Sequence, residues 1–138
     1  YEPTPILHAT VGQVRPTEIT SREVVENWLN QYDGKLPCDA IICFHDNMAL
    51  GVFQAMRNAG RRIPDDIALA GYDNLSPQLF EAAGLSLTTV NQPVGLIGDQ
   101  AARLLFEHLN QSKLLKPECI ALHCDLLIRQ SCGCTHQA

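Results

Sequence analysis

The stretch CDAIICFHDNMALGVFQAMRNAGRRIPDDIALAGYDN, residues 38–74, decides the fold because it places one helix between two apolar strands. Ile41 to Phe44 form a continuous apolar run, and Ile67 to Tyr72 form a second one. Runs of this kind are typical of parallel strands that are covered on both faces. A strand, a helix and a second parallel strand make a right-handed βαβ unit. The stretch therefore predicts an α/β fold with a doubly wound, mostly parallel sheet.

Polar residues follow both apolar runs at the point where each strand should end. His45 and Asp46 come after the first run, and Asp73 and Asn74 come after the second. Ligands of open α/β sheets bind beyond the carboxyl ends of the strands. We therefore expect a binding site at this edge of the sheet.

The composition predicts one globular domain. The chain has 138 residues, of which 46% are hydrophobic and 18% charged, with a formal net charge of −5. Direct nucleic-acid contact by this segment is not expected, because phosphate binding needs clustered Lys and Arg. No run reaches the roughly 20 apolar residues of a membrane span. We expect a soluble, cytoplasmic protein, and the start without Met suggests a fragment of something longer.

The six cysteines are expected to be free thiols, because a chain of this size can build a core without disulfides. Cys43 and Cys124 sit in apolar runs, where cysteine acts as a small core residue. A metal or redox role is conceivable for Cys132 and Cys134 with His136. Structural zinc needs four ligands, commonly with C-x-x-C spacing, and we therefore expect no metal.

Four segments outside the central stretch also have recognisable signals. Thr20-Ser-Arg-Glu23 resembles a capping box, which predicts a helix from Ser21 to Tyr32. Ser76-Pro77 predicts the start of a short helix that ends at Gly84. A strand is expected at 86–90, a long helix at 94–110, and one or two strands at 120–128. The apolar face of the long helix comprises Val94, Ile97, Ala101, Leu104, Leu105 and His108.

Known catalytic signatures are missing from the chain. It has no nucleophile elbow, P-loop, dinucleotide fingerprint or H-E-x-x-H motif. His45 and Asp73 could form an acid–base pair, but no serine or cysteine in a matching context completes a catalytic set. We therefore expect a protein that is not an enzyme and that has no cofactor.

Two roles are open for each candidate site residue. Asp73 could accept hydrogen bonds from vicinal hydroxyls or an amine, or it could start an Asx-turn. His45 is either a ligand contact or a hydrogen-bonded histidine at a strand end. Asp46 is placed to cap the helix that follows, with a structural role beside the site.

Several motifs resemble the lactose-repressor and galactose-repressor family of ligand-responsive regulators. F-H-D-N-M-A-L-G at 44–51 is similar to the family segment N-D-x-M-A-x-G. A-G-R-R-I-P-D-D-I-A-L-A-G-Y-D-N at 59–74 is similar to G-x-x-V-P-x-D-I-x-V-x-G-[FY]-D. L-T-T-V-N-Q-P at 87–93 and L-I-R-Q-S at 127–131 follow in family order and spacing. The resemblance covers nearly the whole chain from Cys38 onward.

This resemblance implies an effector domain with the type I periplasmic-binding-protein fold. It implies that Asp73 contacts a small polar effector, such as a sugar or nucleobase, and that Gln92 lies near the cleft. His45 stands where the family usually has asparagine. That change exchanges an amide for an imidazole and alters which ligands would fit.

The same resemblance implies that residues 1–138 are the C-terminal lobe of a ligand-sensing domain. The family's helix-turn-helix and first lobe are missing, and residues 94–113 would be a crossover segment that belongs to the other lobe. The exposed apolar face of that helix would favour a homodimer or higher oligomer. We therefore expect an effector-sensing domain of a transcription regulator that works by ligand-linked lobe closure. The ending R-Q-S-C-G-C is also similar to sensor segments that precede a histidine kinase or diguanylate cyclase, and this alternative stays open.

Overall fold

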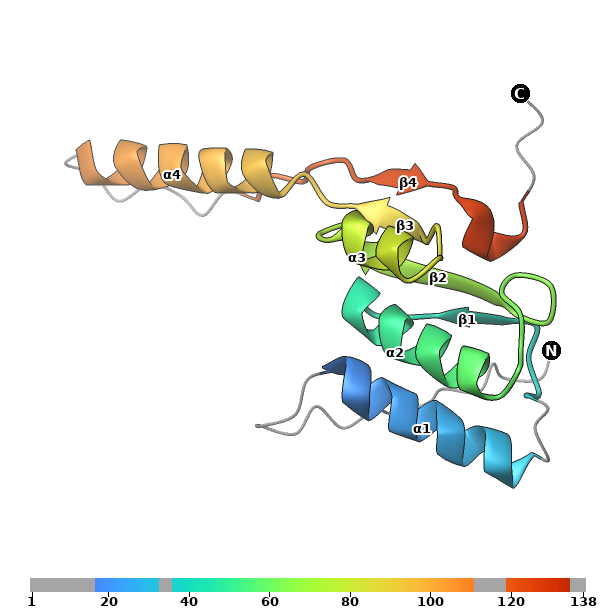
Figure 1. Ribbon diagram of the computed structural model, residues 1–138. Helices are drawn as coiled ribbons and strands as arrows, with labels where there is room; N and C mark the ends of the chain where they lie inside the picture. Colours follow the sequence, from blue (N-terminus) through green and yellow to red (C-terminus); the bar gives the residue numbers. More distant parts are fainter. Residues whose placement is uncertain (1–16, 33–35, 111–118, 135–138) are drawn as a thin grey trace, which may run out of the picture.

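The core of the computed structural model is a four-stranded sheet in the order β1-β2-β3-β4 (Figure 1). The structure describes residues 17–32, 36–110 and 119–134. The strands are β1 (Ala40–Ile42), β2 (Ala68–Asp73), β3 (Thr88–Asn91) and β4 (Asp125–Leu127). The pairs β1–β2 and β2–β3 are parallel, and β3–β4 is antiparallel. The expected mixed α/β architecture with a mostly parallel sheet is confirmed.

Four α-helices and one 3-10 turn accompany the described strands. They are α1 (Thr17–Gln31), α2 (Asp46–Asn58), α3 (Pro77–Ala82), α4 (Val94–Asn110) and the turn Gln130–Cys132. The short helix begins after Ser76 with Pro77 at its first position, as expected. The prediction that Thr20 caps a helix beginning at Ser21 was wrong, because α1 already includes Thr17 and Thr20 lies in its first turn. Packing explains the difference, since Ser21 is buried and its hydroxyl donates to the Met48 carbonyl 3.0 Å away.

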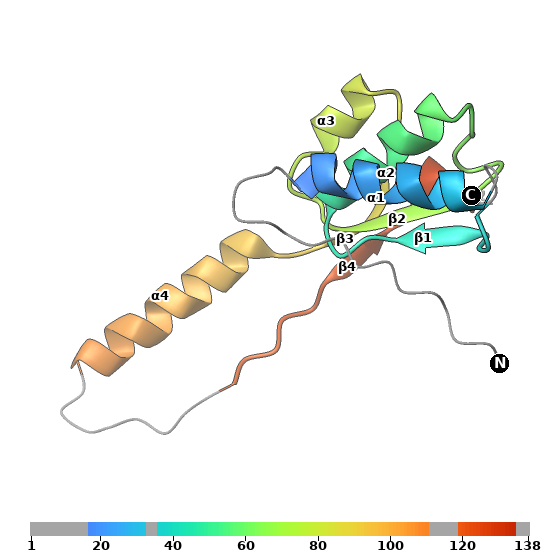
Figure 2. The same ribbon diagram turned by 90° about the horizontal axis from the view of Figure 1, so that it is seen from below.

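The helices α1, α2 and α3 pack on the same face of the sheet and share one apolar core (Figure 2). Each buried leucine, valine or methionine stabilises the fold by about 1.5–3 kcal/mol relative to an exposed position. Gly51 allows α2 to approach α1 closely, because a Cβ at this position would lie 2.1 Å from the Glu18 carbonyl oxygen. The core residues are Val25, Leu29, Cys43, Ala49, Val52, Ala55, Met56, Ile67, Leu69, Phe80, Leu85 and Leu87.

The other face of the sheet is open among the described residues. Successive side chains of a strand point to opposite faces, so only every second residue of an apolar run reaches the helices. Cys43 is buried on the helix side, whereas Ile42 is 83% exposed and Phe44 is 84% exposed. Tyr72 and Leu126 are also exposed. The described helices α1, α2 and α3 lie on one side of the sheet, and cover of the second face stays a prediction for the residues outside the described part.

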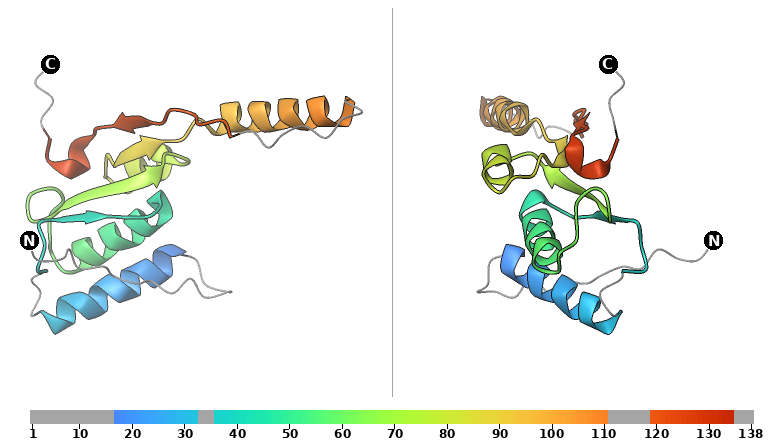
Figure 3. Two further views of the ribbon diagram at one scale, coloured as in Figure 1. Left: turned by 180° about the vertical axis from the view of Figure 1, so that it is seen from behind. Right: turned by 45° about the vertical axis from the view of Figure 1, so that its right-hand side comes forward.

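The long helix α4 extends away from the sheet (Figures 1 and 3). Its bounds, Val94–Asn110, agree with the sequence prediction, but none of its residues is buried. A hollow of about 380 Å³ separates part of its apolar face from the segment that leads into β4, and Ile97, Leu104 and Leu122 line it. The assignment of 94–113 to another lobe stays a prediction, and residues 111–113 lie outside the described part.

Candidate functional site

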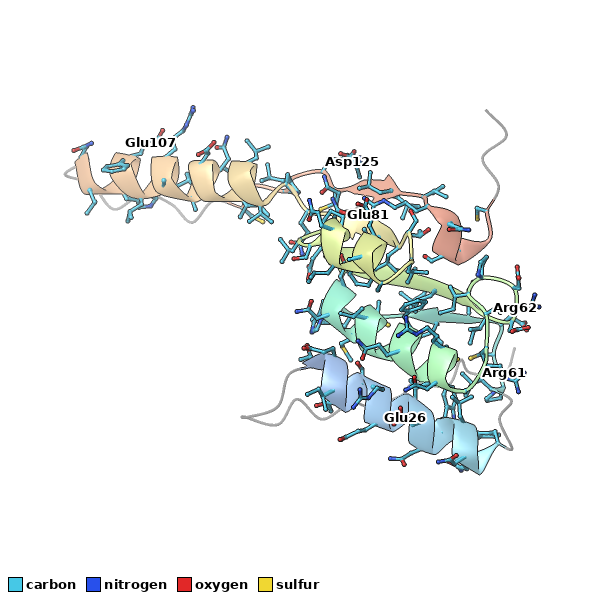
Figure 4. The ribbon with its side chains drawn as sticks, in the orientation of Figure 1. Glu26, Arg61, Arg62, Glu81, Glu107 and Asp125 are labelled. Carbon is cyan, nitrogen blue, oxygen red and sulfur yellow. The ribbon has the colours of Figure 1, made fainter. Side chains whose placement is uncertain are left out.

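Three parallel strands bring polar residues to one edge of the sheet. His45 follows β1, Asp73 ends β2, and Asn91 ends β3 with Gln92 directly after it. Asp73 and Asn91 are register partners on neighbouring strands. This is the carboxyl edge, where ligands of open α/β sheets bind. The helix α2 begins at the same edge, whereas Arg61 and Arg62 lie beyond its far end (Figure 4).

Asp73 and Gln92 are in direct contact. The Nε2 amide of Gln92 donates a hydrogen bond to Oδ1 of Asp73. Both side chains are half-buried. The bond holds one carboxylate oxygen in place and leaves Oδ2 for a donor outside the described residues. Asp73, which the family resemblance implies as a ligand contact, therefore lies together with Gln92, which the resemblance places near the cleft.

The backbone at the end of β2 has a strained conformation. Asp73 has φ of 113° and Asn74 has φ of 55°, which non-glycine residues adopt rarely. Such residues cost about 1–3 kcal/mol each and persist only when surrounding contacts hold them. The amide N–H of Asn74 donates to Asp46 Oδ2 at 2.9 Å, and its Nδ2 donates to Asn91 Oδ1 at 2.9 Å. Arg129 Nη2 donates to Asn74 Oδ1, also at 2.9 Å. These three contacts hold Asn74 in place directly after Asp73, and the bond from Gln92 holds the Asp73 carboxylate itself.

Asp46 is not the helix cap that the sequence predicted. It is the first residue of α2, only 6% exposed, and its Oδ1 accepts a hydrogen bond of 2.7 Å from Thr89 Oγ1. Burial raises the pKa of this carboxyl, although the hydrogen bonds from Thr89 and Asn74 oppose that shift. Asp46 therefore joins the start of α2 to the ends of β2 and β3.

The cap of α2 is His45. Its backbone is extended, with φ of −153° and ψ of 164°, as an N-cap residue requires. Its Nδ1 accepts a hydrogen bond from the Met48 amide at 3.3 Å. The Phe44 ring packs edge-on against the imidazole, with centroids 6.0 Å apart. His45 thus has a structural role at the helix start and lies at the same edge as Asp73.

Sequence reasoning did not predict the contacts of four residues that complete the hydrogen-bond network: Asn74, Asn91, Thr89 and Arg129. Thr89 lies in the T-T-V segment and Arg129 in L-I-R-Q-S, so their motifs were the available signal. Arg129 binds the Leu87 carbonyl at 2.7 Å as well as Asn74, and it therefore connects the last described segment to the strained loop.

Among the described residues, the carboxyl edge forms one wall of the candidate site and lies outside the hollows found on this part of the chain. The hollow of about 380 Å³ described above lies along α4. Another, of about 170 Å³, lies between the C-terminal ends of α1 and α2, near Leu29, Met56 and Arg61. Neither includes His45, Asp73 or Gln92. A ligand bound at the edge would need a second wall.

The described cysteines do not form disulfides or metal clusters. All six are free thiols, and the described residues contain no group of three potential metal ligands. Burial raises the pKa of Cys43 to about 12, and the carboxylate of Asp46 acts in the same direction. The proposed partner of Cys132 and Cys134, His136, lies outside the described residues. None of the described helices has the length and apolar character that crossing a membrane requires.

The chain is similar to known proteins over nearly its whole length. A family model of the periplasmic binding protein-like domain matches residues 2–132. The transcriptional repressor PurR of Mannheimia succiniciproducens is 42% identical over 92 residues, covering 67% of this chain and 27% of that protein. The chain therefore spans about a quarter of the length of this relative.

Solved structures of transcriptional regulators are also similar to this chain. A LacI family transcriptional regulator of Enterococcus faecalis with bound ribose has a TM-score of 0.68 and 30% identity, covering 83% of this chain and 40% of that one. A LacI family regulator from an Arthrobacter species in complex with lactose has a TM-score of 0.68 and 28% identity, covering 83% and 41%. The family match includes every described helix and strand, and the chain belongs to the periplasmic binding protein-like domain family, as part of a LacI family effector domain.

Proposed function

We propose that this chain is the C-terminal lobe of an effector-sensing domain in a cytoplasmic transcription regulator of the lactose-repressor and galactose-repressor type. The observation that carries the proposal is the Asp73 carboxylate, held by Gln92 on a strained loop at the carboxyl edge. A fixed carboxylate oxygen can accept hydrogen bonds from ligand hydroxyl groups. Strained backbone is concentrated at ligand sites, where it orients side chains before binding.

The effector in this proposal is a small sugar or similar polyol. Two structural relatives hold ribose and lactose, and the chain shares their fold at 28–30% identity. The contact residues are Asp73, Gln92 and His45. The edge binds without chemistry in this proposal, because Asp73 is engaged by Gln92 and the Nδ1 of His45 is engaged by the Met48 amide.

The second wall of the site belongs to another lobe, which α4 joins. The exposed apolar side chains of α4, such as Leu105 and Leu109, need cover in the complete protein. An effector that binds both lobes would favour the closed arrangement by its difference in affinity for the two states. The same helix would also favour a homodimer or higher oligomer.

The proposal is tested by calorimetry on the complete protein with ribose and lactose. Asp73→Ala should weaken binding at least about tenfold, because a charge-assisted hydrogen bond contributes about 1.5 kcal/mol or more. Asp65→Ala is the matched control, since Asp65 is an exposed aspartate that pairs with Arg62 far from the edge. Equal affinity of the Asp73 variant and the parent would exclude this site assignment.

A further inference from the structure

We propose that Cys132 and Cys134 form a redox-active dithiol, which a low-molecular-weight disulfide converts into a Cys132–Cys134 disulfide. Gly133, between the two cysteines, lies beside Pro64 in the loop that leads into β2 (Figure 1). Asp73 is at the other end of the same strand. The proposed redox site is therefore separate from the ligand edge and does not depend on the proposed function.

The first step concerns how the chain brings the two thiols together. The 3-10 turn Gln130–Cys132 is closed by the amide of Gly133, which donates to the Gln130 carbonyl at 3.1 Å. Gly133 has φ of 72°, a conformation that glycine adopts readily. The chain folds back at this residue, and the amide of Cys134 donates to Cys132 Sγ at 3.4 Å. The backbone of one cysteine thus contacts the sulfur of the other.

The second step concerns whether a disulfide fits this turn. Bridged cysteines need Cα atoms about 4.4–6.8 Å apart. Residues two positions apart span at most about 7 Å in an extended chain, and a turn shortens that distance. The position of Cys132 is fixed by its neighbour Ser131, which is fully buried and donates to the Leu69 carbonyl at 2.6 Å. Cys134 is exposed, so its side chain can rotate toward Cys132 without disturbing the core.

The third step concerns which thiol attacks. Burial opposes the ionisation of Cys132, but hydrogen bonds from the Thr88 hydroxyl and from the amide and thiol of Cys134 outweigh it and hold the pKa of Cys132 below its ordinary value. The same contact raises the pKa of Cys134, whose thiol donates to Cys132. The thiolate is the nucleophile in thiol–disulfide exchange. Cys132 is therefore the first of the two to attack.

The neighbours of Cys132 allow this ionisation. The protonated thiol donates to the Arg129 carbonyl at 3.3 Å, and only this weak bond is lost with the proton. The Thr88 hydroxyl donates to the same carbonyl at 3.0 Å, and rotation about its C–O bond turns it toward the sulfur. The guanidinium of Arg129 stays with the Leu87 carbonyl and Asn74. Hydrogen bonds, and not a paired cation, thus stabilise the thiolate.

The reaction is a two-step thiol–disulfide exchange. The Cys132 thiolate attacks one sulfur of the small disulfide, forms a mixed disulfide and releases one thiolate. The Cys134 thiol then loses its proton to solvent and attacks Cys132 Sγ, which expels the second thiolate. Two protein thiols lose two electrons and two protons, and the small disulfide takes up both and becomes two thiols. The small disulfide is thus the only oxidant that the reaction needs.

The surroundings of the pair give a small disulfide access and favour the reduced state at rest. A disulfide that is exposed or strained is more oxidising than a buried structural one. The resting state is therefore the dithiol, which agrees with the free thiols of both cysteines. A hollow of about 460 Å³ opens beside the pair, and it is lined by Pro64, Asp65, Gln130, Gly133 and Cys134.

Peptide mass spectrometry tests the proposal on the complete protein. The reduced protein is incubated with glutathione disulfide, treated with iodoacetamide and digested with trypsin. Trypsin cleaves after Arg129, so Cys132 and Cys134 fall in a peptide that begins at Gln130 and contains none of the other four cysteines. We expect this peptide to lose two hydrogen atoms and to carry no alkyl group. A peptide with two alkyl groups, with glutathione on both thiols, or joined to another peptide would overturn the proposal.

Three variants identify the role of each thiol. Cys134→Ser should stop the reaction at the mixed disulfide of Cys132 with glutathione, because the second nucleophile is missing. Cys132→Ser should lose the intrachain disulfide and react with glutathione disulfide more slowly than Cys134→Ser does. Cys119→Ser is the matched control, since it removes an exposed cysteine outside the pair, and it should give the parental disulfide.

Two results of these variants would contradict the order of attack. Cys132 that stays fully alkylatable in Cys134→Ser would exclude it as the first nucleophile. Equal rates of the two serine variants with glutathione disulfide would exclude the activation of Cys132 by its hydrogen bonds. None of these measurements uses a sugar, so a failure of the redox proposal leaves the proposed sensor function intact, and the reverse also holds.

Discussion

Gly71 keeps the Asp46 carboxylate in its place, and replacing it should damage both the fold and the edge. A Cβ at position 71 would lie 2.2 Å from Asp46 Oδ1 and 3.0 Å from Leu87 Cδ2. The carboxylate would have to move by about 1 Å to reach ordinary contact. It would then lose the hydrogen bond from Thr89 or the one from Asn74.

The size of the effect follows from these contacts. A hydrogen bond to a charged group contributes about 1.5–3 kcal/mol, and removing glycine from a strand returns about 0.5–1 kcal/mol. Gly71→Ala should therefore lower the free energy of unfolding by about 1–2 kcal/mol for one lost bond. Urea denaturation followed by circular dichroism measures this change.

Two comparisons make the test specific. Gly98→Ala lies in α4 with no atom within 4 Å of its Cβ, and it should stabilise the chain by up to about 1 kcal/mol through helix propensity. In an Asp46→Ala background, Gly71→Ala should cost much less, because the atom it meets has gone. A Gly71→Ala variant as stable as the parent, or an equal cost in both backgrounds, would refute the reasoning.

Three further predictions concern titration, thiols and assembly. The folded protein holds the pKa of Asp46 above its ordinary value of 3.8, so the folded state binds a proton more readily than the unfolded state. The parent should therefore gain stability relative to Asp46→Asn as the pH falls from 7 toward 4. A stability difference that does not change with pH would contradict this. An alkylating reagent without reductant should modify all six cysteines of the unfolded chain, as counted by mass spectrometry. In the native state it should leave Cys43 unmodified, because this thiol is buried and has a raised pKa. Fewer than six modified cysteines after unfolding would reveal a disulfide. Light scattering of this chain should detect dimers or larger assemblies that Leu105→Asp in α4 reduces, and a monomeric parent would argue against pairing through α4.

The order of helices and strands followed from the sequence because hydrophobic periodicity depends on neighbouring residues. The long helix at 94–110 and the short helix after Ser76 were predicted with nearly the observed bounds. The cap of α2 was assigned one residue too late, because His45 and Asp46 can both accept an amide hydrogen bond. Only the backbone angles decide between them.

The hydrogen-bond network of the site could not be predicted in the same way. Thr89 and Asp46 are 43 positions apart, and Arg129 and Asn74 are 55 positions apart. Such contacts depend on strand order and register, which local patterns do not determine.

The antiparallel pairing of β4 with β3 affects how movement at α4 would reach the site. The chain leaves the sheet after Asn91 and returns at Asp125, and these two residues are register partners. Any body carried by α4 is therefore attached through two adjacent strands instead of one. Two connections side by side resist sliding of such a body along the sheet but permit the body to twist and bend. It would therefore rotate about the point where Asn91 pairs with Asp73. The rotation axis of the moving part would thus pass beside the carboxylate that we propose contacts the effector.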